Sequence, residues 1–131
     1  DSQLAALILP DGLRQILLGL IEWPSLLILA EVTTIVVLGA IGVHPMITAS
    51  MLIPATLLLE AQIAAPILAH IIVLAWALNS TTSAWTLPVV VTSNAFGVPL
   101  RSLVLGRNIA FIIIFGPLAC AALGMLNRLL T

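Results

Sequence analysis

The chain has 131 residues, of which 62% are hydrophobic and 7% are charged, and its mean hydropathy is +1.29. Four basic and five acidic residues cannot cover the surface of a water-soluble globule of 13.8 kDa, so lipid has to replace water around most of it. A net charge of -1 without a basic patch excludes nucleic-acid binding. We therefore expect an integral protein of the cell (inner) membrane, with the lipid bilayer as its first partner.

The first 23 residues differ from the rest. Gln3, Arg14 and Gln15 interrupt the apolar positions there, and Pro10-Asp11-Gly12 breaks any helix. This pattern predicts interfacial or connecting helices over residues 1–23 rather than a membrane span. Residues 24–131 are then the transmembrane unit. Because the chain opens with Asp1 and lacks a basic leader, we expect it to be a piece of a longer protein.

The first part of this unit is predicted to be a helical hairpin over residues 24–60. Residues 24–42 are almost wholly apolar and just long enough to cross a membrane, which takes about 20 residues. The sequence GVHP at 42–45 breaks the helix, and the arm that follows is shorter and contains Pro54. Two such arms form a hairpin with its tip at Gly42 to Pro45, and we expect a re-entrant one.

Five small polar residues, Asn79 to Ser83, divide the next span, residues 63–97; we call them the polar run. The 16 apolar residues before the run reach only about 24 Å, against a hydrocarbon core of about 30 Å. One interpretation makes the run an exposed turn, since Trp76 and Trp85 flank it. The other makes it unwound backbone at membrane depth, away from the ends of the last helix at 108–130.

The order of these parts resembles one repeat, the C-terminal half, of an ion transporter superfamily permease, similar to the divalent-anion/sodium symporters. The segments that carry the resemblance are HPMITASMLIPATLL, like the hairpin tip and its following arm, and ALNSTTSAWTLPVVVTSNAFGV, like the broken span. The resemblance implies an all-α membrane fold with a re-entrant hairpin, a discontinuous helix and a closing helix. It also implies a secondary active transporter, or symporter, that moves a small organic or inorganic anion coupled to sodium or protons. The partner is a second repeat on a longer chain or on a second subunit.

The candidate binding residues lie at the two tips. Gly and Pro supply helix breaks, while hydroxyls and an amide offer oxygens to sodium and hydrogen bonds to an anion. Glu31, within an apolar stretch, is the candidate intramembrane acid: it faces a cavity or stays protonated against the bundle. The substrate and ion candidates are Gly42, His44, Pro45, Thr48 and Ser50 at the hairpin tip, and Asn79, Ser80, Thr81, Thr82 and Ser83 in the polar run.

Catalytic and metal motifs are not found in the sequence. His44 and His70 lack the spacing of metal ligands, and neither a phosphate loop nor a nucleophile elbow is present. We expect no enzyme activity, no metal and no cofactor beyond a coupling ion such as sodium. Two alternatives stay open. The chain is a structural or assembly subunit of a membrane complex, packed through Gly116, Ala119, Ala122 and Gly124, or it is a small channel or holin-like pore.

Overall fold

The computed structural model describes residues 12, 15–16, 19, 22–58 and 61–131. Within these residues every regular element is a helix, so the predicted all-helical class is confirmed. Most of residues 1–23, for which connecting helices are expected, lie outside the described part of the chain. The last two residues of the predicted hairpin, 59 and 60, also lie outside it.

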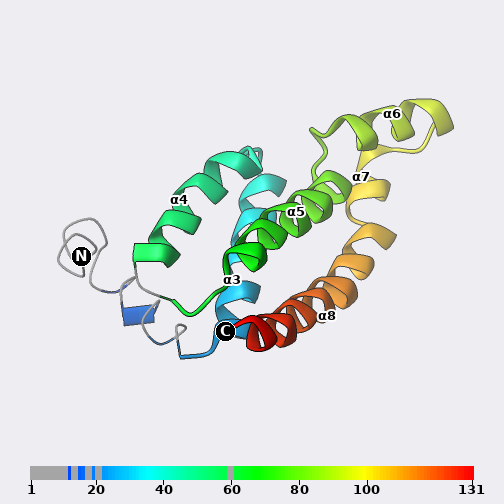
Figure 1. Cartoon of the computed structure of the whole chain (residues 1–131). Helices are drawn as coiled ribbons and strands as arrows, with labels where there is room; N and C mark the ends of the chain where they lie inside the picture. The colour runs from blue at the N-terminus through cyan, green and yellow to red at the C-terminus, as the bar shows by residue number, and fades with distance from the viewer. Residues whose placement is uncertain (1–11, 13–14, 17–18, 20–21, 59–60) are drawn as a thin grey trace.

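Helices α3 (Pro24–Ala40) and α4 (Pro45–Leu58) are joined by a short turn and run antiparallel (Figure 1). Pro24 and Pro45 each begin a helix, where the missing N–H costs nothing and the fixed φ suits the first turn. Gly42 has φ of 103°, a conformation that L side chains rarely adopt, and it lets the chain reverse. The turn lies at the residues where GVHP predicts a break.

Helices α5 (Ala65–Thr82) and α8 (Arg107–Leu130) form a second antiparallel pair, and α3 packs against both. Branched side chains between α3 and α5 make the core, including Ile28, Ile35, Ile67 and Ile71, each at most 1% exposed. Cys120 of α8 joins this core as a small buried side chain.

Between α5 and α8 the chain forms α6 (Leu87–Phe96) and the short α7 (Leu100–Val104). Figure 1 places both at the end of the molecule opposite to the C terminus. α6 buries only Val89 and ends at Gly97, whose φ of 62° is the left-handed conformation typical of a helix C-terminus.

Two stretches, residues 65–96 and 100–130, are long and apolar enough to cross a membrane; α3 and α4 are shorter apolar helices. α8 alone has 24 residues, or about 36 Å, more than the hydrocarbon core of about 30 Å. Many of its large apolar side chains are exposed, among them Phe111, Ile113, Leu118 and Met125. Such a surface suits lipid or a partner helix.

The expectation that the polar run is unwound backbone is wrong for Asn79 to Thr82, which form the last turn of α5. The hydroxyls of Ser80 and Thr81 donate to carbonyls of the preceding residues, Ala77 and Leu78, at 2.7 and 2.8 Å. A helix therefore satisfies these groups without a break. The break comes later, between Ser83 and Thr86, before Pro88 in the first turn of α6.

Candidate functional site

The turn between α3 and α4 lies against the C-terminal end of α5, so the two predicted tips meet. The ring centroids of His44 and Trp76 are 6.4 Å apart. A Cβ built on Gly42 would lie 3.8 Å from the indole nitrogen of Trp85, and one built on Gly39 would overlap the side chain of Asn79. The missing side chain of Gly39 is what lets α5 approach α3 here.

The candidate residues of the hairpin tip divide by burial. Pro45 and Thr48 are buried. Ser50 is exposed and donates to the Ile47 carbonyl at 2.8 Å. His44 is also exposed, and its Nδ1 accepts the Met46 N–H at 3.3 Å, so it caps the start of α4. The tip therefore presents the Thr48 hydroxyl to the interior, while Ser50 and His44 face outward.

The polar run divides in the same way. Asn79, Thr82 and Ser83 are buried, at 3%, 8% and 3% exposure. Ser80 and Thr81 instead line a pocket of about 260 Å³ with Pro88, Val89, Thr92, Leu103 and Asn108. We call it the polar pocket. α6 and α8 both begin beside this pocket, and helix N-termini attract anions. The seven residues named as its lining include no acid.

The position of the polar run contradicts a second expectation, that it lies away from the ends of the last helix. The Asn108 side chain, in the first turn of α8, donates to the Thr81 carbonyl at 2.7 Å. The run is thus level with the N-terminal end of α8. Long-range packing decides this level: the end of α5 needs a donor for its free carbonyls, and α8 supplies one.

Glu31 lies in α3 and is 4% exposed. Its Oε1 accepts a hydrogen bond from the Thr56 hydroxyl of α4, while its Oε2 has no hydrogen-bond partner among the described residues. Within the same residues it makes no ion pair with a basic side chain. The Glu31 carboxyl thus faces the bundle, against α4, which is the position that the second interpretation gave it.

A second group of buried polar residues lies nearer to the α3–α4 turn than Glu31 does. Gly39 of α3 and Thr48 of α4 lie about two helical turns from Glu31 and Thr56, toward the loop that joins the two helices. Asn79 contacts Gly39. Thr48 Oγ1 and Asn79 Oδ1, like Glu31 Oε2, have no partner among the described residues. We call this set the polar row: Glu31, Thr56, Thr48, Asn79, Thr82 and Ser83.

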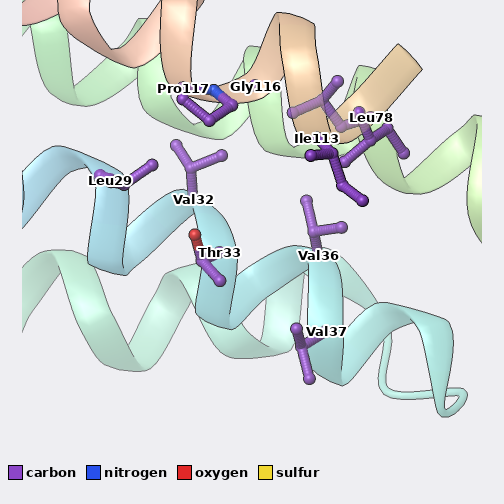
Figure 2. Close-up of a pocket in the computed structure, with 10 residues that line it drawn as sticks. Leu29, Val32, Thr33, Val36, Val37, Leu78, Ile113, Gly116 and Pro117 are labelled. Carbon is purple, nitrogen blue, oxygen red and sulfur yellow. The ribbon is translucent and has the colours of Figure 1, made fainter. Parts of the chain in front are cut away.

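A further pocket, of about 290 Å³, lies between α3 and α8 and is apolar (Figure 2). Figure 2 shows Leu29 and Val32 of α3 pointing toward Gly116 and Pro117 of α8. Gly116 contributes no side chain, which leaves space there. Because its walls offer almost no polar atoms, this pocket can hold an apolar group but not an ion.

Sequence analysis missed Thr56, Thr92, Asn108 and Asn127. Asn127 is 1% exposed, accepts the Ala64 N–H at 2.8 Å and donates to the Gln62 carbonyl at the same distance. Its signal was a lone amide near the end of an apolar helix, since such a group has to find a partner in the bundle. Thr56 and Thr92 carry no signal that separates them from other threonines.

Comparison with known proteins adds no family to this geometry: no protein-family model, curated protein or solved structure matches the chain. The fold defines only a class, an all-helical protein with two stretches able to span a membrane.

Proposed function

We propose that the chain is a membrane-embedded element of a secondary transporter that moves a small organic or inorganic anion coupled to sodium or protons. The observation that carries this proposal is the polar row. Three polar atoms on α3, α4 and α5 have no hydrogen-bond partner in the described part of the chain and belong to residues under 5% exposed inside an apolar bundle. Each such atom costs free energy of about 1–3 kcal/mol, and an intramembrane acid typically marks an ion path.

In this proposal the polar pocket receives the anion. Its volume of about 260 Å³ lies just below the range for drug-sized ligands, about 300–1,000 Å³, which suits a small anion. The Thr92 hydroxyl would donate to the anion, and the Ser80 and Thr81 hydroxyls would do so on turning away from the Ala77 and Leu78 carbonyls. The N-termini of α6 and α8 would add partial positive charge. Since the polar run is level with the end of α8, the pocket would be an outer site. The polar row would connect it to Glu31 in the interior.

The re-entrant character of the α3–α4 pair is part of the proposal. The 14 residues of α4 reach about 21 Å, less than the hydrocarbon core of about 30 Å. A re-entrant pair enters and leaves the membrane on the same side, so neither of its helices has to be long enough to cross it. A second repeat, on a longer chain or on another subunit, would complete the path.

Transport by the complete protein tests this function. Proteoliposomes would take up labelled sulfate, succinate or citrate, with and without sodium or pH gradients. We expect Ser80→Ala and Thr92→Val to lower uptake about tenfold or more, because a hydrogen bond to a charged group contributes about 1.5–3 kcal/mol. Thr33→Val, on the exposed side of α3, is the matched control and should transport normally. Wild-type uptake of all three anions at the rate of empty liposomes would contradict the proposal.

A second candidate, an assembly subunit of a membrane complex, is favoured by a groove between α5 and α8. The groove has a volume of about 710 Å³ and apolar walls that include Ala77, Ala119 and Ala122. Small residues of this kind let a partner helix approach closely. Normal assembly of a complex together with no anion uptake would favour this candidate.

A further inference from the structure

Glu31 is buried without a compensating charge among the side chains that the structure describes. Among the residues whose side chains the structure describes, it is the only Asp, Glu, Lys or Arg that is buried. Of the side chains one turn away on α3, Leu27, Ile28 and Ile35 are apolar and each at most 1% exposed. The fourth, Thr34, is half-buried and donates its hydroxyl to the Ala30 carbonyl. A carboxylate in such surroundings is costly unless a positive charge neutralises it. Its oxygens therefore need either a cation or a proton while the bundle is closed.

The described residues offer too few oxygens around Glu31 for a metal ion. Hard cations such as calcium and magnesium take about six or more oxygen ligands. The residues at this site supply the two carboxylate oxygens and the hydroxyl of Thr56, which already donates its hydrogen to Oε1. A proton needs only one oxygen, and Oε2 has no hydrogen-bond partner among the described residues.

We infer that Glu31 is the proton-binding residue of this chain and that a proton, not sodium, is the ion coupled to anion movement. The coupling part rests on the transport function proposed above. The proton-binding part rests on the site itself and is tested separately.

The step at Glu31 is a reversible protonation. A proton from water on one side forms an O–H bond at Oε2, and the neutral carboxyl is then stable in the apolar bundle. When the bundle opens to the other side, the O–H bond breaks and the proton passes to water, leaving the carboxylate. Thr56 donates to Oε1 in both states. One proton crosses, and nothing is oxidised or reduced.

Other titratable groups on the neighbouring elements are few. α4 carries none between Pro45 and Leu58. α5 carries His70, which is exposed and has its Nδ1 2.7 Å from the Pro66 carbonyl. α8 carries Arg107 as its first residue, the buried Cys120 thiol and the exposed Arg128, and Glu22 is exposed before the start of α3. Variants at Glu22 and His70 are therefore the controls for any pH effect assigned to Glu31.

Infrared difference spectroscopy tests proton binding on the purified full-length protein, without any anion. Raising the pH should remove a carboxylic-acid C=O band from the wild-type spectrum. Glu31→Gln, which keeps an acceptor for Thr56, should lack this band, whereas Glu22→Gln and His70→Gln should retain it. A wild-type spectrum without a titrating band, or a band that survives in Glu31→Gln, would overturn the inference.

Proteoliposomes containing a pH-sensitive dye test the coupling. In sodium-free buffer, an inward proton gradient should accelerate wild-type uptake of labelled sulfate, succinate or citrate several-fold and acidify the lumen. Glu31→Gln should lose this stimulation entirely, yet still exchange internal for external anion. Stimulation by sodium alone, or full stimulation in Glu31→Gln, would overturn proton coupling. A titrating Glu31 band in a protein that moves no anion would support the proton site and contradict the proposed function.

Discussion

Asn127 Oδ1 accepts the backbone N–H of Ala64 at 2.8 Å, a hydrogen bond that joins the last turns of α8 to the residue before α5. At the opposite end of the same helix pair, Asn108 donates to the Thr81 carbonyl at 2.7 Å. Each asparagine pairs a backbone group at one end of α5. The α5–α8 pair is thus fastened at both ends, and its register fixes where the polar pocket forms.

Replacing Asn127 by Leu should destabilise the fold. The substitution leaves the Ala64 N–H and the Gln62 carbonyl without their partner, which costs about 1–3 kcal/mol for a buried group. Thermal unfolding in detergent should show a lower melting temperature. Asn127→Asp should also melt below wild type, since it keeps the acceptor for Ala64 but sets a buried carboxylate against the Gln62 carbonyl.

The control for this series is Asn94→Ala, at an exposed position of α6, which should melt as wild type does. Equal melting temperatures for Asn127→Leu and Asn94→Ala would show that the hydrogen bonds of Asn127 do not hold α5 to α8.

Gly39→Ala should weaken the contact between α3 and α5. The new Cβ would overlap the Asn79 side chain, and overpacking of this kind typically costs about 1–3 kcal/mol. Gly116→Ala is the matched control, because a Cβ there meets only the end of Leu78 at 3.8 Å. Adding Asn79→Ala to Gly39→Ala should restore part of the loss in a double-mutant cycle of unfolding free energies. Additive losses in that cycle would contradict the contact.

The helix boundaries are the part of the fold that local sequence predicts. Pro24 and Pro45 begin α3 and α4, and Gly42 and Gly97 adopt positive φ at the two reversals. These positions are predictable because the ring of proline and the missing Cβ of glycine restrict or free the backbone at the residue itself.

The state of the polar run could not be predicted in that way. Ser and Thr hydroxyls can hydrogen-bond to nearby backbone groups either in a turn or within a helix. Composition therefore does not decide between a turn and a helix here. The run is helical because the Thr86 hydroxyl, beyond the break, lies 2.9 Å from the Ser80 carbonyl and helps to cap α5. The level of the run depends on Asn108, far along the chain, which no local pattern links to Thr81.

Thr56→Val should destabilise the α3–α4 pair. The change removes the donor to Glu31 Oε1 and leaves the whole carboxyl without a hydrogen bond from a described residue. Interhelical hydrogen bonds in membrane proteins contribute about 0.6 kcal/mol, and at most about 1.7, so the loss of unfolding free energy should be near the upper value. Thr56→Ser keeps the hydroxyl and should restore most of it. Thr33→Val, exposed on α3, should change nothing; a loss of equal size there would contradict this account.

Water access to the polar pocket is the most direct test of the central claim that this chain binds a small anion for transport. A single cysteine at Thr92, in a Cys120→Ala background of the full-length protein, would be treated in membranes with a charged, thiol-specific methanethiosulfonate reagent. The account predicts that Thr92→Cys reacts and that sulfate, succinate or citrate slows the reaction several-fold, while a cysteine at exposed Asn94 reacts at a rate that no anion changes. A Thr92 cysteine that does not react, or that reacts at the same rate with and without each anion, would contradict it.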